Sequence, residues 1–177
     1  MFIFGCLFLE TKVVSKNDYL IALVLAILAA FLTAATYWHL IYTNFFVGSI
    51  FFNHWLTIIG TSYIAIATPA FVLLKRFYPL KIKQLLRFHI FGNLILFTLI
   101  AIHVAGQTSR TLADYPSLGL GLAMFIALTL EVISGFAERF PILPQISQKT
   151  NKFIHASLIM VFYLVIGFHV LHVLGYI

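Results

Sequence analysis

The sequence predicts an all-α integral membrane protein, a bundle of five transmembrane helices. Hydrophobic residues make up 62% of the 177 residues and charged residues only 9%, with a mean hydropathy of +1.05. Such a chain has too little polar surface to cover a water-soluble globule. A helix needs about 20 mostly apolar residues to cross a bilayer. Five stretches qualify: 19–43, 54–75, 88–106, 118–137 and 153–176. We therefore expect residues 19–177 to form one transmembrane domain in the lipid bilayer.

Residues 1–18 are expected to form a cytoplasmic or interfacial segment before the first span. The segment is apolar only from Phe2 to Leu9, and its first basic residue, Lys12, follows that run. A cleaved signal peptide has the reverse order. Cys6 is the only cysteine, so no intrachain disulfide is expected.

The basic residues predict the orientation of the chain. If the five stretches are helices, ten of the eleven Lys and Arg residues fall on one side of the membrane, and only Arg110 falls on the other. The positive-inside rule then places the N-terminus in the cytoplasm and the C-terminus outside. The formal charge of +6 reflects this bias and contact with anionic lipid. It does not indicate nucleic acid binding. Trp38 and Trp55 fall at the predicted outer ends, where aromatic belts occur.

Four histidines repeat one spacing on two helices. His89 and His103 are 103 − 89 = 14 residues apart in the third span, and His155 and His169 are 169 − 155 = 14 apart in the fifth. Fourteen helical residues end about 40° short of four full turns and rise ~21 Å. Each helix therefore presents two imidazoles near one face at two depths. Both spans run in the same direction, so the depths match.

Two facing imidazoles at each of two depths predict two non-covalent b haems. Haem iron takes one axial nitrogen from each side, whereas zinc and copper favour three or four converging donors. We expect His89 and His155 to ligate an inner haem iron, and His103 and His169 an outer one. His172 is the alternative to His169 as the outer ligand. It lies 17 residues after His155, which turns it about 100° away from the helix face of His155. The alternative is that each histidine only bonds a neighbouring carbonyl.

Smaller and basic residues nearby are assigned supporting roles. Gly92 and Gly106 follow the third-span histidines by three residues, where a missing side chain would admit a flat porphyrin; ordinary small-residue helix packing is the alternative. Phe162, seven residues from each fifth-span ligand, is expected to fill the gap between the haems, or simply to pack. Arg87 and Arg110 are placed to pair with inner and outer haem propionates, as are Arg139, Lys149 and Lys152 on the inner side. The positive-inside bias explains these residues equally well.

The remaining histidines lie on the predicted outer side. His39, His54 and His172, with Arg110 and Asp114, are candidates for a pocket that receives an acceptor or a quinone. Interfacial histidines that tolerate the headgroup region are the alternative.

Glu131 is an acid well inside the fourth span, and an intramembrane carboxylate is a functional candidate. It could accept a proton from quinol or orient a ligand imidazole. A structural hydrogen bond to a neighbouring helix is the alternative.

The histidine pattern, the inside N-terminus and the stretch "LLRFHIFGNLILFTLIAIH" resemble the ferric reductase-like transmembrane domain of NADPH oxidases and ferric-chelate reductases. The resemblance covers residues 19–177. It implies electron flow from NAD(P)H through FAD to an inner haem, then to an outer haem, and then to oxygen or a ferric complex. In that family a flavin and nicotinamide domain usually follows; none is expected within these residues, and "SLGLGLAM" is better explained as helix packing than as a phosphate loop. No flavin or NAD(P)H site is expected here, so a separate reductase or a quinol must donate.

The sequence thus favours an electron-transferring, ferric-reductase-like oxidoreductase component. The acceptor would be ferric ion, oxygen or a partner protein on the outer side. Two alternatives remain. One is a quinol-reactive cytochrome b subunit of a larger respiratory complex, and the other is a haem-free metal transporter or assembly subunit.

Overall fold

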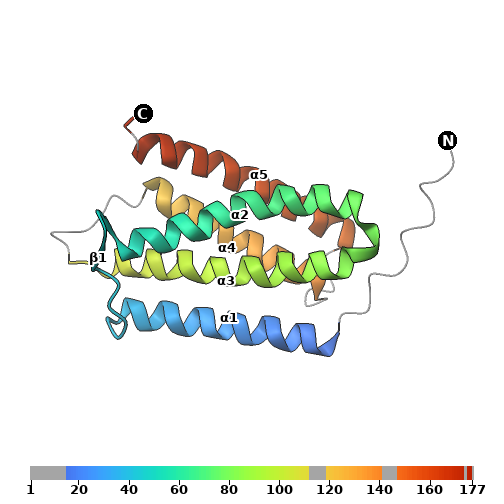
Figure 1. Ribbon diagram of the computed structural model, residues 1–177, viewed down its shortest axis with the longest axis horizontal. Coiled ribbons are helices and arrows are strands. Elements are labelled where there is room, and N and C mark those ends of the chain that lie inside the picture. The colour runs from blue at the N-terminus through green and yellow to red at the C-terminus, as the bar shows by residue number, and fades with distance from the viewer. Residues whose placement is uncertain (1–14, 112–118, 141–146, 174, 177) are drawn as a thin grey trace.

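The computed structural model describes residues 15–111, 119–140, 147–173 and 175–176. Within them the chain forms five long α-helices, a two-stranded hairpin and one 3-10 turn (Figure 1). All five α-helices are long and apolar enough to cross a membrane, which confirms the prediction of a multi-pass integral membrane protein. In order, the elements are α1 (Lys16–Tyr37), β1 (Phe46–Val47), β2 (Ile50–Phe51), α2 (Phe52–Phe77), η1 (Pro79–Lys81), α3 (Ile82–Thr108), α4 (Gly119–Arg139) and α5 (Gln148–Val173).

The two ends of the bundle differ in chemistry. Helices α1, α3 and α5 begin, and α2 and α4 end, at what we call the basic end, which carries most of the lysines and arginines, including Lys75, Arg87 and Lys152. The opposite end, the hairpin end, carries the antiparallel strands β1 and β2, paired through Phe46 and Phe51. Helices α3 and α5 therefore run in the same direction, as the histidine argument requires.

The first helix differs from its predicted span, 19–43. It begins at Lys16, where the side chain of Ser15 accepts a hydrogen bond from the Asn17 amide at 3.2 Å. It ends at Tyr37 because His39 adopts the left-handed conformation, with φ of 59°. The Leu40 amide then donates to the Ala35 carbonyl at 2.8 Å, which closes the helix in the manner of a C-terminal cap.

Helix α3 is the centre of one group of helices. Helices α1 and α2 both pack along it, whereas α5 packs along α4. The two groups meet through a smaller contact between α3 and α4 and through a shared apolar core. That core is formed by Ile64, Ile100, Met124, Leu128 and Phe162.

A glycine brings α2 and α3 into backbone contact. A β-carbon at Gly60 would lie 2.8 Å from the Leu96 carbonyl oxygen and 2.9 Å from Cγ1 of Ile100. Close approach of this kind is a main source of helix association in membranes, where lipid tails remove the hydrophobic driving force between helices.

Substituting Gly60→Ala is therefore expected to lower stability by about 1–3 kcal/mol, because the added methyl overpacks a backbone contact. Thermal unfolding in detergent, followed by circular dichroism, measures the change. Gly167→Ala is the matched control, since a β-carbon there meets nothing within 4 Å. Equal stability of the two variants would contradict the close packing of α2 on α3.

Candidate functional site

Each histidine of α3 with the repeated spacing lies within electrostatic range of its predicted partner on α5. His89 of α3 lies within electrostatic range of His155 of α5, and His103 of α3 within range of His169 of α5. Helices α3 and α5 do not pack closely on each other in the described part of the chain. The imidazoles therefore approach from helices that are held apart.

The hydrogen bonds of His103 fix the position of its proton. Its Nδ1 lies 2.9 Å from the backbone carbonyl oxygen of Asn53, and a carbonyl can only accept. The proton therefore resides on Nδ1, and Nε2 carries the lone pair. In return, Nδ2 of Asn53 donates to the His103 carbonyl at 3.3 Å. Asn53 is fully buried, so α2 holds this imidazole from inside the bundle.

His155 is held in the same tautomer by α4. The Ser134 hydroxyl donates to the Glu131 carbonyl at 2.8 Å. A hydroxyl has one hydrogen, so its 2.9 Å contact with Nδ1 of His155 must be donated by the imidazole. Nε2 of His155 is again the nitrogen with the lone pair. Sequence reasoning missed Ser134, because nothing in the pattern of apolar residues marks a lone serine as a partner.

His89 has an amide neighbour and a ring neighbour. Nδ2 of Asn93 lies 3.3 Å from Nδ1 of His89, while Oδ1 of Asn93 is buried without a hydrogen bond among the described residues. With the amide in this orientation Nδ2 donates to Nδ1, and the proton of His89 is on Nε2; with the two amide atoms exchanged, Oδ1 accepts from Nδ1–H instead. The contact therefore engages Nδ1 in either tautomer. Phe71 stacks on the imidazole with centroids 4.6 Å apart and planes 18° apart. Both contacts fix the orientation of the ring.

The structure assigns Gly92 and Gly106 to helix packing, the alternative weighed for them. A β-carbon at Gly92 would collide with the Tyr63 hydroxyl, and one at Gly106 would lie 2.8 Å from Nδ2 of Asn53. Both glycines therefore face α2. Three residues turn a helix by about 300°, so each glycine lies about 60° around α3 from the histidine before it, on a neighbouring strip of surface that α2 covers.

Two other glycines, on α4, adjoin the α5 imidazoles. A β-carbon at Gly135 would lie 3.2 Å from Cε1 of His155, and one at Gly121 would lie 3.6 Å from Cε1 of His169. These glycines are also 135 − 121 = 14 residues apart. That repeat was a usable sequence signal, because it matches the spacing of the histidines they face.

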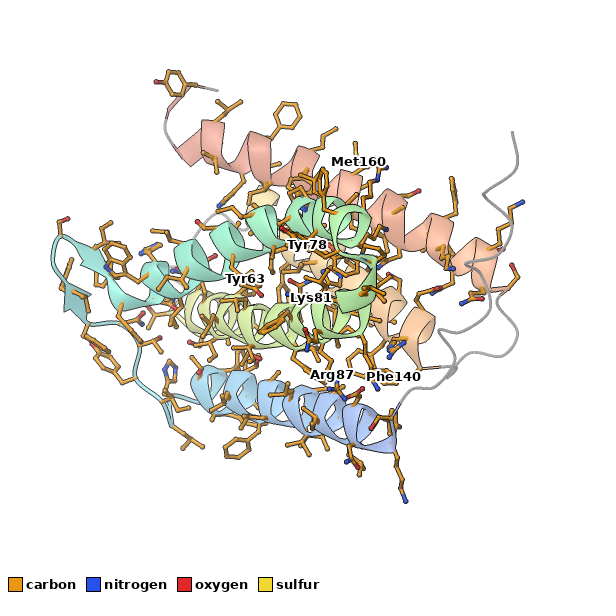
Figure 2. The ribbon with its side chains drawn as sticks, turned by 45° about the vertical axis from the view of Figure 1, so that its right-hand side comes forward. Tyr63, Tyr78, Lys81, Arg87, Phe140 and Met160 are labelled. Atoms are coloured by element: carbon orange, nitrogen blue, oxygen red, sulfur yellow. The ribbon has the colours of Figure 1, made fainter. Side chains whose placement is uncertain are left out.

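At the basic end, Arg87 already has a carboxylate partner. Its Nε lies 3.0 Å from Oδ1 of Asp18, and a second nitrogen lies 3.4 Å from Oδ2. Figure 2 labels Arg87, which this pair joins to α1. Lys152 similarly approaches Glu138 at 3.6 Å. The Asp18–Arg87 pair, which the sequence analysis did not anticipate, ties α1 to α3 near His89.

At the hairpin end, part of the predicted acceptor pocket forms. The rings of His54 and His103 have centroids 5.5 Å apart, and Arg110 lies within electrostatic range of both. His172 is within range of His169. No contact joins His39 to this group among the described residues, and Asp114 lies outside them. In the same residues no three His, Cys, Asp or Glu side chains converge as a metal site.

Two further predicted residues are buried in the bundle. Phe162 is 1% exposed at the centre of the shared core, so it packs between the two histidine levels. Glu131 is 5% exposed, and its Oε2 has no hydrogen bond within the described residues. Tyr163 lies within its electrostatic range and donates to the Ala65 carbonyl at 2.9 Å.

Comparison with known proteins adds no family: no family model, curated protein or solved structure matches the chain. Its chemistry must be argued from the site itself. The site offers two pairs of imidazoles at two depths. In the three with a defined hydrogen bond, Nδ1 is engaged by the protein, and none of these bonds in the described part of the chain uses Nε2.

Ser134→Ala is expected to change the environment of a single imidazole, because Ser134 contacts His155 alone among the seven histidines. Magic-angle-spinning NMR of protein labelled with 15N-histidine measures this as a shift of one Nδ1 resonance, the same one that disappears in His155→Gln. Thr98→Val is the matched control, since the buried Thr98 hydroxyl donates only to the Leu94 carbonyl. Similar shifts of several resonances in both variants would contradict the assigned bond.

Proposed function

We propose that this protein carries electrons across the membrane through two b haems, each held between one imidazole of α3 and one of α5. The inner haem would be ligated by His89 and His155, and the outer one by His103 and His169. The observation that carries the proposal is the engagement of Nδ1, which leaves the Nε2 lone pair for a metal. When bound, a haem supplies a reversible one-electron iron couple.

The residues around the imidazoles fit such a group. Helices α3 and α5 are not packed on each other. Two helices that held a macrocycle between them would be separated in this way. Gly121 and Gly135 place no side chain on the α4 surface beside the α5 imidazoles, which leaves room there. The apolar core around Phe162 separates the two levels, which are ~21 Å apart along the helix axis, and excludes water between them.

We propose the direction and the partners of the flow from the charge pattern of the sequence and from the family resemblance. The positive-inside rule favours the basic end as the cytoplasmic side. A separate flavin and NAD(P)H reductase, or a quinol, would donate there, and ferric ion, oxygen or a partner protein would accept outside. The resemblance to the ferric reductase-like transmembrane domain supports this order.

A quinol donor is the second candidate, and Glu131 is the observation that favours it. Its Oε2 is buried and has no hydrogen bond among the described residues, and its main-chain carbonyl accepts from Ser134, the partner of His155. A quinol hydroxyl would supply the missing donor near the inner pair.

The haem content of purified protein tests the sites. We expect a pyridine haemochrome assay to give two protohaems per chain for the wild type and for His39→Ala. We expect one per chain for His89→Ala and for His103→Ala, because the levels are too far apart to share a ligand.

Absent or covalently bound haem would overturn the proposal and favour a haem-free metal transporter. If His169→Ala kept both haems and His172→Ala lost one, His172 would replace His169 as the outer ligand.

Sealed vesicles test conduction. In His89→Ala, dithionite added outside should still reduce the outer haem, whereas NADPH with a flavin reductase, or a quinol analogue, supplied at the cytoplasmic face should not. The reason is distance, since the outer level lies near the far side of a hydrocarbon core about 30 Å thick. Absorbance of the reduced haem measures the outcome, with His39→Ala as the control. Unchanged reduction in His89→Ala would show that electrons enter at the outer level.

A further inference from the structure

The inner and the outer pair of imidazoles lie among different charges. Two charged side chains lie within electrostatic range of the inner pair, the carboxylate of Glu138 and the ammonium of Lys75. Within range of the outer pair lies the guanidinium of Arg110. In the described part of the chain, the inner pair thus has an anion and a cation beside it, and the outer pair has a cation alone.

Glu138 is held near His155 by hydrogen bonds that join α4 to α5. The amide Nδ2 of Asn151 donates to the Ser134 carbonyl at 3.0 Å and to Oε2 of Glu138 at 3.1 Å. The Ser134 hydroxyl in turn contacts Nδ1 of His155 at 2.9 Å. Asn151 is 6% exposed, so the carboxylate has a fixed place beside the inner pair.

The cations at the basic end offset only part of the charge of Glu138. Nζ of Lys152 lies 3.6 Å from Oε1 of Glu138, and the lysine side chain is 50% exposed while that of Glu138 is 22% exposed. Lys75 is exposed as well. Water and salt screen exposed charges more than half-buried ones. The carboxylate is therefore the less screened charge near the inner pair.

Arg110 has no such counterpart at the hairpin end. It follows His103 by 110 − 103 = 7 residues, nearly two helical turns, which places it toward the same side of α3. It is also within range of His54, whose ring centroid lies 5.5 Å from that of His103. Among the described residues no Asp or Glu lies at this end, so the outer pair has a positive surrounding.

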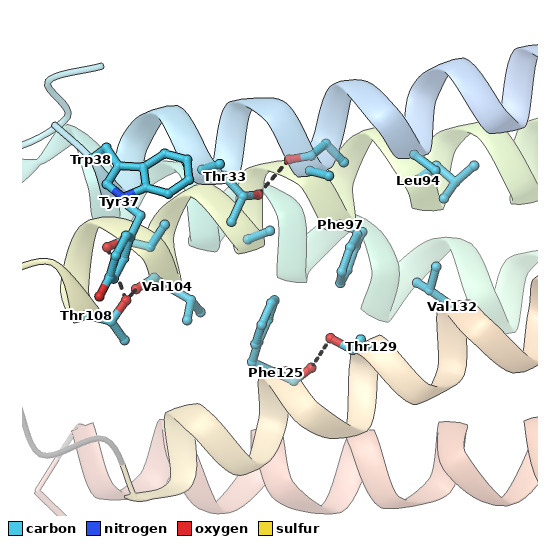
Figure 3. Close-up of a pocket in the computed structure, with 16 residues that line it drawn as sticks. Thr33, Tyr37, Trp38, Leu94, Phe97, Val104, Thr108, Phe125, Thr129 and Val132 are labelled. Atoms are coloured by element: carbon cyan, nitrogen blue, oxygen red, sulfur yellow. Dashed lines mark hydrogen bonds between the residues drawn. The ribbon is translucent and has the colours of Figure 1, made fainter. Parts of the chain in front are cut away.

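The other side of α3 adds no charge. Figure 3 shows a cavity of about 550 Å³ there, between α1, α3 and α4, with Phe97 and Phe125 pointing toward each other between its walls. It adjoins Ala101, which is about 200° around the helix from His103. None of its lining residues in the described chain is charged. The charges that act on the two pairs are therefore those at the two ends of the bundle.

Charges of this kind set a reduction potential. Reduction adds one negative charge to a redox group, so a nearby cation favours the reduced form and a nearby anion favours the oxidised form. At a distance of roughly 10 Å and an effective dielectric constant of about 20, one unit charge changes such an equilibrium on the order of tenfold.

We propose that Glu138 lowers the midpoint potential at the inner pair and that Arg110 raises it at the outer pair, so that electrons pass downhill from the basic end to the hairpin end. In each step one electron leaves the inner iron and reduces the outer iron, with no bond or proton exchanged. The inference rests on the proposed function and adds to it the residues that set the direction of flow.

Variants with a single haem give each potential separately. We expect His103→Ala to keep the inner haem and His89→Ala the outer one, and spectroelectrochemical titration to give the higher midpoint potential for the outer one. In the first background Glu138→Gln should raise the potential, and in the second Arg110→Gln should lower it. Each change should be roughly tenfold in the reduction equilibrium, or about 59 mV for one electron. Glu138→Gln keeps an acceptor oxygen for Asn151, so the local packing is preserved.

Lys83→Gln in both backgrounds is the matched control, because Lys83 is exposed and is not among the charges near either pair. Glu138→Asp and Arg110→Lys keep the charges and should restore most of each potential. Shifts no larger than those of Lys83→Gln, shifts of opposite sign, or a higher potential at the inner pair would overturn this inference and leave the proposed function standing. A wild type without haem would overturn both.

Discussion

The structure depends on one constraint: inside a bilayer, every polar group must find its partner within the protein. An imidazole in such a helix has two nitrogens to satisfy. Here neighbouring helices satisfy one of them, through the carbonyl of Asn53 on α2 for His103 and through Ser134 on α4 for His155. This division explains the grouping of the helices, because α2 must pack on α3, and α4 on α5, for the bonds to form.

The spans, and the two levels of histidines on α3 and on α5, could be predicted because they depend on quantities that a sequence contains. Lipid selects apolar runs of fixed length, and fourteen residues return a helix to nearly the same face. The hairpin at Phe46–Phe51 could not be predicted in this way, because four strand residues carry no periodic signal. The end of α1 depends on the left-handed backbone conformation of His39. Glycine or asparagine usually occupies such a position, so a histidine gives no signal for it in the sequence.

The partners of individual side chains were harder to predict than the helices. Gly92 and Gly106 carry the right spacing for a cofactor surface, yet α2 fills the space beside them. Arg87 carries the right charge for a propionate, yet Asp18 occupies its guanidinium. In both cases the competing residue lies on another helix, at a position that only the crossing of helices determines. The spacing along one helix tells which side of that helix a residue faces, but it does not tell which residue of another helix lies on that side.

Glu131 connects the constraint to the proposed function. A carboxyl group with one unpaired buried oxygen is costly in hydrocarbon whether or not it is ionised. Neither salt bridge of the described residues, Arg87 with Asp18 or Lys152 with Glu138, reaches it. On the proposed function, a quinol hydroxyl near the inner pair would donate the hydrogen bond that Oε2 lacks and offset the cost. A buried acid whose main-chain carbonyl accepts from Ser134, the partner of His155, is thus easier to explain by a hydrogen-bonding occupant at the inner level than by apolar packing alone.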